Sequence, residues 1–297
     1  MDENLNSNND LLSSFIFDEL PIRGVIVKLD QVIKTIFSTQ TYPPIIQQLL
    51  SEALIAVVML FSLSKESGKM TLQFQSENEK NPIKLLSVRC TFDRKLRALA
   101  QWNTPLDNSA SFSDLMGHGQ LVMTYQSDSS LDQFQSMIPL TGNSLSDSVE
   151  AYFTQSDQLK TYLKISSGNQ EQDQPQIASG IMLQVMPELS NQADKQEESF
   201  IHVTTLAKTL TDLELLKDSP ETILIKLFSQ DQVRVFEPRE LYFGCGCSLE
   251  KMQDAIRSMG KTEALKILEE EGYLEVKCEF CQTQFSFAQN EVEKLFS

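Results

Sequence analysis

The segment "YFGCGCSLEKM", Tyr242–Met252, holds two cysteines one residue apart, and "VKCEFCQTQF", Val276–Phe285, holds two more. The chain has 297 residues and five cysteines, and four of the five lie in these two segments. They read C-x-C, then thirty residues, then C-x-x-C. Clustered thiols of this kind bind a metal, form disulfides or carry out thiol redox chemistry. The pattern therefore decides how the C-terminal part of the chain folds.

A structural zinc site is the first interpretation of the four cysteines. Zinc in such sites takes four tetrahedral ligands, and C-x-x-C places two sulfurs on one turn. Gly246 lets the backbone turn so that the two thiols of C-x-C converge. Residues 241–297 number only 57, too few to rely on a hydrophobic core alone. The sequence predicts a small C-terminal zinc domain with four cysteine ligands, which leave no open position for Lewis-acid catalysis.

The thirty residues between the cysteine pairs have regular patterns. "SLEKMQDAIRSMG" and "KTEALKILEEEG" each predict a helix that ends at a glycine. "YLEVKC" then predicts a strand that leads into Cys278, and "FSF" predicts its returning partner.

The composition is that of an ordinary globular protein, with 41% hydrophobic and 22% charged residues. The formal net charge is −16. This charge opposes non-specific binding to nucleic acid and to anionic membranes, which both attract cationic proteins. We therefore expect neither nucleic acid nor a membrane among the partners.

The N-terminal residues "MDENLNSNND" lack the basic and apolar regions of a signal peptide. The most apolar stretch, residues 43–63, is interrupted by polar residues, and its unbroken apolar run covers only residues 53–61. A membrane span needs about 20 apolar residues, so we expect a buried core helix here and a cytoplasmic protein. A reducing cytosol disfavours permanent disulfides.

Patterns along the chain predict an α+β fold. Residues 1–15 are expected to be disordered. Residues 16–187 alternate strands such as "IRGVIVKL" and "MTLQFQS" with helices, and their short spacing favours an N-terminal mixed α/β domain with an antiparallel-rich sheet. Residues 188–240 predict a mostly helical linker, in which "PETILIKLFSQ" places Ile223, Leu227 and Phe228 on one apolar face.

The cysteine motifs and their spacer resemble those of the bacterial redox-regulated heat-shock proteins of 33 kDa. The resemblance covers nearly the whole chain after the first fifteen or so residues. It is carried in the C-terminal region by "CGCS", "EALKILEEEGYLEVKCEFC" and "FSF", and upstream by "RGVIVKL", "YPPIIQQLLSEALIAVVML", "VEAYFTQSDQL" and "GIMLQVMP".

This resemblance implies a holdase chaperone that is not an enzyme and uses no ATP. The reduced form would hold one Zn²⁺ and be inactive. Oxidation would form disulfides, release zinc and unfold the C-terminal region, and the active form, a homodimer, would bind unfolding client proteins. The implied zinc ligands are Cys245, Cys247, Cys278 and Cys281, and the implied disulfides are Cys245–Cys247 and Cys278–Cys281.

The same resemblance assigns a role to each predicted segment. Residues 16–187 would bind substrate and dimerise, residues 188–240 would be a metastable linker, and residues 241–297 would be the zinc-binding redox switch. Zinc would join two segments thirty residues apart, whereas disulfides within each pair would join each segment only to itself. Four cysteines allow three pairings, and the sequence alone does not choose among them.

Two other functions remain open from the residues. One is a zinc-ribbon protein-interaction module without redox switching. The other is a thiol oxidoreductase that uses Cys278 and Cys281, although its C-x-x-C lies between two strands rather than at a helix start. The fifth cysteine, Cys90, is interpreted as a core residue, and His118 and His202 are expected to be neither metal ligands nor catalytic bases.

Overall fold

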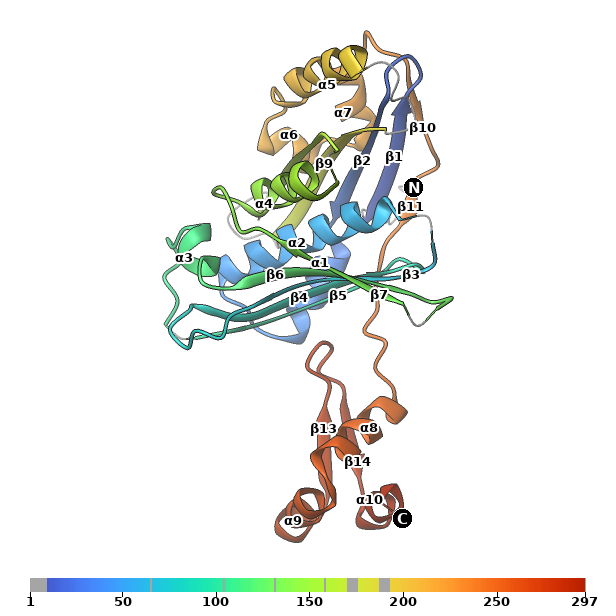
Figure 1. Ribbon diagram of the computed structural model, residues 1–297. Helices are drawn as coiled ribbons and strands as arrows, with labels where there is room; N and C mark the ends of the chain where they lie inside the picture. Colours follow the sequence, from blue (N-terminus) through green and yellow to red (C-terminus); the bar gives the residue numbers. More distant parts are fainter. Residues whose placement is uncertain are drawn as a thin grey trace, which may run out of the picture. The chain divides into compact units, whose positions relative to one another are not determined.

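The structure is a computed structural model that describes residues 10–64, 66–103, 105–130, 132–157, 159–169, 176–186 and 193–296. The chain forms two compact units, Met1–Phe243 and Gly244–Ser297 (Figure 1). The boundary lies three residues beyond the predicted start of the zinc domain at residue 241, because the short strand that precedes the first cysteine pairs within unit 1.

The first sheet of unit 1 has the strand order β10-β1-β2-β9-β8, with β11 also paired to β1. Every described pairing in it is antiparallel. Its strands are β1 (Leu11–Phe17), β2 (Ile22–Leu29), β8 (Thr161–Asn169), β9 (Gln176–Val185), β10 (Val233–Val235) and β11 (Arg239–Glu240).

The second sheet has the order β12-β5-β4-β3-β6-β7 and is antiparallel except for the β12–β5 pair. The predicted α+β class with antiparallel-rich sheets is thus confirmed. The strands are β3 (Gly68–Gln75), β4 (Ile83–Thr91), β5 (Lys95–Trp102), β6 (Gln120–Ser127), β7 (Gln133–Ile138) and β12 (Tyr242–Phe243).

The helices of unit 1 surround and separate these sheets (Figure 1). Short elements that the sequence patterns did not predict include α1, α3, β7 and the π-helical turn after α4. The helices are α1 (Gln31–Thr39), α2 (Pro44–Ser62), α3 (Phe112–Met116), α4 (Leu145–Tyr152), the π-helix Phe153–Asp157, α5 (Ala193–Ala207), α6 (Asp212–Lys217) and α7 (Pro220–Phe228).

Helix α2 is the predicted core helix. It lies between the two sheets and contacts strands of both (Figure 1), and every residue from Ala53 to Leu60 is buried. Among the described helices only α2 is long and apolar enough to cross a membrane, and 78% of that window is buried inside the protein. Burial against two sheets explains why its sequence is apolar all round.

The linker, residues 188–240, belongs to unit 1 by its contacts. Its predicted helical character is confirmed by α5, α6 and α7, which cover the outer face of the first sheet (Figure 1). After α7 the linker runs along the edge of the first sheet as β10 and β11, and β12 follows directly on the edge of the second. The linker therefore covers one face and one edge of the first sheet.

The linker helices and the first sheet share one hydrophobic cluster. The Phe228 ring on α7 meets the Phe17 ring edge-on, with centroids 5.0 Å apart, and lies 6.5 Å from that of Phe15. The predicted apolar face of α7, including Ile223 and Leu227, is buried in this cluster. Sheet residues of the cluster are Phe15, Phe17, Ile22, Ile26, Ile181, Leu183 and Val185.

The prediction of disorder for residues 1–15 was wrong for residues 11–15, because β1 begins at Leu11 and pairs with β2; residues 1–9 lie outside the described residues. Asp10 is 1% exposed. Its carboxylate accepts hydrogen bonds from the backbone N–H groups of Asp30, Gln31 and Val32 at the start of α1, and its carbonyl accepts one from Leu241.

Replacing this capping carboxylate should destabilise unit 1. Asp10→Ala would leave buried N–H groups without an acceptor, which costs about 1–3 kcal/mol. Urea unfolding of unit 1 measures the change in free energy, and the exposed Asp128→Ala is the control and should change it by less than about 0.5 kcal/mol. Equal stability of both variants would show that Asp10 does not anchor α1.

Candidate metal centre

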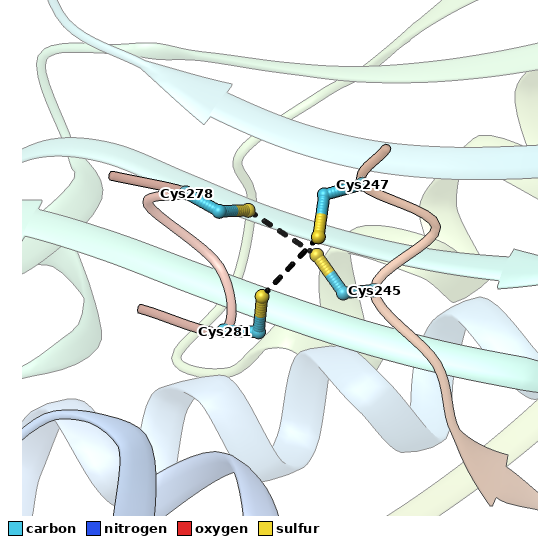
Figure 2. A group of neighbouring side chains, drawn as sticks. All are labelled: Cys245, Cys247, Cys278 and Cys281. Carbon is cyan, nitrogen blue, oxygen red and sulfur yellow. Dashed lines mark hydrogen bonds between the residues drawn. The ribbon is translucent and has the colours of Figure 1, made fainter. Parts of the chain in front are cut away.

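The four cysteines of unit 2 converge at one point. All four Sγ atoms lie within 4.8 Å of one another, and their side chains point inward from two loops (Figure 2). Two close approaches run between the loops: Cys245 Sγ lies 3.3 Å from Cys278 Sγ, and Cys247 Sγ lies 3.5 Å from Cys281 Sγ. All four cysteines are in the thiol form. The structure thus brings together every residue that the sequence predicted for the site.

The second loop is the turn of a β-hairpin. Strands β13 (Leu274–Lys277) and β14 (Gln284–Phe287) pair antiparallel, and the turn between them is closed by the Cys278 N–H bonded to the Thr283 carbonyl at 2.9 Å. The Gln282 N–H donates to the Cys278 carbonyl at 2.8 Å. This turn brings Cys278 and Cys281 to the same side.

The first loop depends on a glycine. Gly246, between Cys245 and Cys247, has a φ of 69°, a left-handed conformation that glycine adopts without strain. Lys251 donates a hydrogen bond to the Gly246 carbonyl, and Ser248 caps helix α8 (Leu249–Met259). The predicted role of Gly246 in turning the C-x-C loop is therefore visible in the backbone.

The electrostatics of the cluster favour a cation. Burial raises the pKa of Cys245 and of Cys247. Burial also opposes ionisation of Cys281, yet hydrogen bonds with Thr283, Cys247 and Cys245 outweigh it and lower the pKa of Cys281 to about 6. Four thiolates packed this closely would repel one another strongly, so full ionisation of the site requires a positive ion among them.

The distances and the donor set suit a tetrahedral thiophilic metal. With Zn–S bonds of about 2.3 Å, neighbouring sulfurs of a tetrahedral site lie about 3.8 Å apart. The two measured inter-loop distances, 3.3 and 3.5 Å, and the 4.8 Å limit for all pairs bracket that value. Four converging cysteines can hold a metal ion, and thiolates select zinc over hard cations such as magnesium.

The rest of unit 2 has a small core. Helices α8, α9 (Lys261–Glu271) and α10 (Gln289–Leu295) pack with the hairpin. Both predicted spacer helices are confirmed, and they end at Gly260 and Gly272. Buried core residues are Ile256, Ala264, Leu268, Leu274, Phe287 and Val292. So few buried side chains agree with a domain that needs a cross-link.

The remaining candidate residues belong to unit 1, whereas the cysteine cluster belongs to unit 2. Cys90 is 1% exposed within the core of unit 1, where burial raises its pKa to about 12, so the predicted core cysteine is confirmed. His202 contacts Asp231 on the surface of the linker, with Nε2 3.0 Å from Oδ1. The described cysteine cluster includes neither His202 nor His118.

Two residues of the site were not predicted. Thr283 Oγ1 lies 3.2 Å from Cys281 Sγ, and Lys251 contacts the turn at Gly246. In the sequence, Thr283 is marked only by its position two residues after Cys281, and Lys251 only by its position in the first turn of α8.

Comparison with known proteins decides the family. The family model described as "Hsp33 protein" matches residues 10–288. The chain belongs to the Hsp33 family. The resemblance stated from the cysteine motifs and upstream strings is confirmed.

Curated Hsp33 relatives match along almost their full length. The chain is 35% identical to the "33 kDa chaperonin" of Aeromonas salmonicida over 98% of this chain and 96% of that protein. It is 33% identical to that of Vibrio vulnificus over 97% and 96%. Membership of the Hsp33 family supports a chaperone function and implies a non-enzymatic role.

A solved structure supports the fold. The 33 kDa chaperonin (Heat shock protein 33 homolog) of Thermotoga maritima superposes with a TM-score of 0.81, at 22% identity and over 97% of each chain. The Hsp33 fold thus extends over both units of this chain.

Removal of one thiol ligand should abolish metal binding. We expect zinc to fall from one ion per chain to near zero in Cys278→Ser, because three thiolates hold the ion far less tightly than four. Unit 2 should then lose hydrogen-exchange protection, since metal binding contributes about 10–16 kcal/mol of apparent folding free energy in small zinc domains.

The matched control is Cys90→Ala, which should keep one zinc ion per chain. Metal analysis of both purified, reduced variants makes the comparison. Retention of stoichiometric zinc by Cys278→Ser with an intact unit 2 would contradict the four-cysteine site.

Proposed function

We propose that this chain is a redox-regulated, ATP-independent holdase chaperone of the cytoplasm that is inactive while its cysteines hold zinc. The observation that carries the proposal is the convergence of four cysteine thiols from two loops thirty residues apart. A metal at this point would be a long-range cross-link in a unit with few buried residues. A signal that consumes the thiols would therefore unfold the unit.

The activating step is a two-electron oxidation of each thiol pair. Two thiols lose two protons and two electrons to form one S–S bond, and hydrogen peroxide, which accepts them, is reduced to two waters. While bound, Zn²⁺ supplies only a cross-link and the charge that keeps the thiolates ionised. Thiols converted to a disulfide have lost their thiolate charge and cannot hold a metal.

We propose the pairing Cys245–Cys247 and Cys278–Cys281, which the resemblance implies. This pairing would join each loop to itself and leave nothing to hold the loops together, so the benefit of closing the intervening loop is lost. In the thiol form two close sulfur contacts, Cys245–Cys278 and Cys247–Cys281, run between the loops. Disulfides along those contacts would preserve the cross-link and would not act as a switch.

The linker is the element that unfolding would release. Its hold on the first sheet is partly apolar, through Phe228, Leu227 and the rest of the shared cluster. Apolar surface on both the helices and the sheet would become accessible when they separate, which a binder of unfolding proteins requires. We therefore propose that residues 188–240 are metastable and that residues 16–187 bind clients and dimerise.

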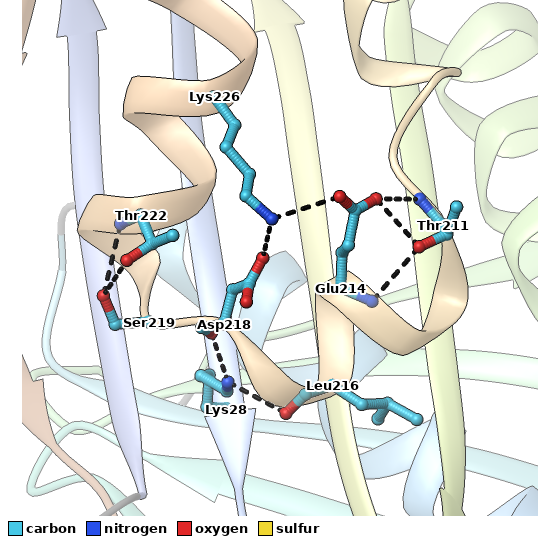
Figure 3. Close-up of polar contacts among 8 residues, drawn as sticks. All are labelled: Lys28, Thr211, Glu214, Leu216, Asp218, Ser219, Thr222 and Lys226. Atoms are coloured by element: carbon cyan, nitrogen blue, oxygen red, sulfur yellow. Dashed lines mark hydrogen bonds and ion pairs between the residues drawn. The ribbon is translucent and has the colours of Figure 1, made fainter.

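Lysines on the sheet also hold the linker, and the sequence did not reveal them. Lys28 Nζ on β2 donates to the carbonyl of Leu216, 3.0 Å away, and to that of Asp218 (Figure 3). Lys164 on β8 donates to the Leu210 carbonyl and pairs with Asp212 at 3.1 Å. Burial lowers the pKa of Lys28, while Asp218 and Glu221 oppose that shift.

Within the linker, α6 and α7 are tied by ion pairs. Lys226 Nζ lies 3.1 Å from Glu214 and 2.7 Å from Asp218 (Figure 3). Glu214 also accepts from Thr211 in a capping box. These bonds lie on the surface, where each contributes little, so the linker helices depend mainly on the apolar cluster and the two sheet lysines, while β10 and β11 pair with β1.

The partners proposed are unfolded or partly folded client proteins, and a second copy of the chain in the activated form. Nucleic acid and membranes are not proposed as partners, because the net charge of −16 opposes both. The alternative, a zinc-ribbon interaction module without switching, predicts the same activity in both redox states.

One assay in two states tests the function. We expect the peroxide-oxidised protein to suppress aggregation of a thermally unfolding client while the reduced, zinc-bound protein does not, with zinc release accompanying activation. A non-reducing digest analysed by mass spectrometry identifies the disulfides. Equal suppression in both states would reject the switch and favour the interaction module.

Weakening the linker's apolar contact should activate the chaperone without oxidation. Phe228→Ala removes a ring that is 2% exposed, and loss of such a ring costs about 3–5 kcal/mol. We expect the reduced, zinc-bound variant to suppress aggregation nearly as well as oxidised wild type.

The matched control for this variant is Ile225→Ala on the same helix, whose side chain is 68% exposed. It should leave the reduced protein inactive. If reduced Phe228→Ala keeps its zinc and stays inactive, the linker contact does not restrain the chaperone.

A further inference from the structure

The outermost strands of unit 1 are β10 and β8 in the first sheet and β12 and β7 in the second. Strand β10 has three residues and β12 has two. On β8, the Leu163 N–H that faces away from β9 donates to the Glu150 carboxylate on α4 at 2.5 Å. Very short edge strands and contacts with neighbouring elements both limit unwanted pairing with other chains.

Strand β7, Gln133–Ile138, has six residues and is a longer edge than β10 or β12. It is an outermost strand of the second sheet and, among the described strands, pairs only with β6 (Figure 1). Apart from the β6 ladder, no backbone hydrogen bond reaches it from another described segment. In an antiparallel ladder about half of the N–H and C=O groups of an edge strand point outward, so β7 offers a row of groups ready for another strand.

The side chains of β7 do nothing to deter such pairing. Its sequence, "QFQSMI", contains no charge, proline or glycine, which are the usual protections of an exposed edge. Phe134 is 66% and Met137 is 63% exposed. Since they are three residues apart on a strand, they project from opposite faces. An incoming strand would therefore find an apolar side chain on each face.

We propose that β7 is a docking edge for extended segments of unfolding client proteins, which would add a strand to the sheet. This inference rests on the proposed client binding and adds its site and chemistry. Main-chain hydrogen bonds would supply affinity, and the segment's apolar residues would contact Phe134 and Met137. Segments that are uncharged or basic would be preferred, because the protein carries a net charge of −16.

A second copy of the chain fits this edge less well. Six residues at about 3.4 Å each give a strip about 20 Å long, and a sheet is about 10 Å thick. Pairing two such strips covers on the order of 200 Å² per partner, well below the roughly 800 Å² of a stable interface. Two copies with a net charge of −16 each would also repel.

The β7 edge differs from the linker-covered surface in its accessibility in the reduced protein. No described linker residue is paired with β7, so its docking groups are accessible while the thiols are reduced. We expect weak binding of extended segments before oxidation, and oxidation would then add the surface released by the linker.

The test uses reduced full-length protein and two synthetic peptides. One alternates threonine and valine between terminal lysines, and the other has the same composition except for prolines at alternate valines, which removes strand pairing. Hydrogen exchange followed by mass spectrometry measures protection in β7. We expect protection with the first peptide and none with the second.

Two variants sharpen the test. Gln135→Lys places a charge on the edge strand and should weaken binding of the first peptide by roughly tenfold, through loss of one or two backbone hydrogen bonds. Gln126→Lys makes the same change on the same sheet face one strand inward, where β6 is paired on both sides, and should leave binding unchanged.

The outcomes separate this inference from the proposed function. Absence of protection in wild-type β7, or equal peptide binding by both lysine variants, would overturn the docking edge, even if the oxidised protein suppresses aggregation. Protection of β7 that grows with protein concentration and needs no peptide would show a second copy as the occupant and would also overturn it. Hydrogen exchange in β7 is measured on the wild-type protein, so the docking edge can be tested even if one of the variants misfolds.

Discussion

The convergence of four cysteine sulfurs from two loops is the constraint on which unit 2 depends. The loops are separated by thirty residues, and only six buried apolar residues form the described core that they enclose. A cross-link at the sulfurs removes the entropy that the open loop would have. The same thiols are readily oxidised groups of the unit. In the proposed switch, stability and sensitivity to oxidants would therefore reside in the same four atoms.

The linker and the strand after it connect the cysteine loops of unit 2 to the sheets of unit 1 along the chain. The strand that follows it, β12, pairs with β5 and directly precedes the first cysteine loop. The linker helices are held by Phe228 in an apolar cluster and by Lys28 and Lys164 on backbone carbonyls. The linker strands β10 and β11 also pair with β1. In the proposed switch, release of this segment would couple loss of the metal to exposure of a sheet face.

Local patterns predicted the cysteine cluster, its two spacer helices and the buried face of α7, because each depends on spacing within a short segment. Strand β1 was missed although "FIF" offered an apolar signal, and the Asp10 cap could not be predicted because its acceptor and donors are twenty residues apart. In the sequence, Lys28 has the pattern of a solvent-exposed strand residue, and only the folded linker provides the carbonyl to which it donates. Contacts between distant segments decide such roles, and one sequence does not contain them.

The central claim is that the metal cross-link in unit 2 controls whether the linker stays docked on unit 1. Hydrogen exchange of α5–α7, measured before and after peroxide in full-length protein with zinc counted in the same samples, tests it most directly. We expect protection of α5–α7 and of unit 2 to fall together as zinc is released, while the central strands β2 and β9 stay protected. Loss of zinc with unchanged protection in α5–α7 would show that the metal does not control docking of the linker.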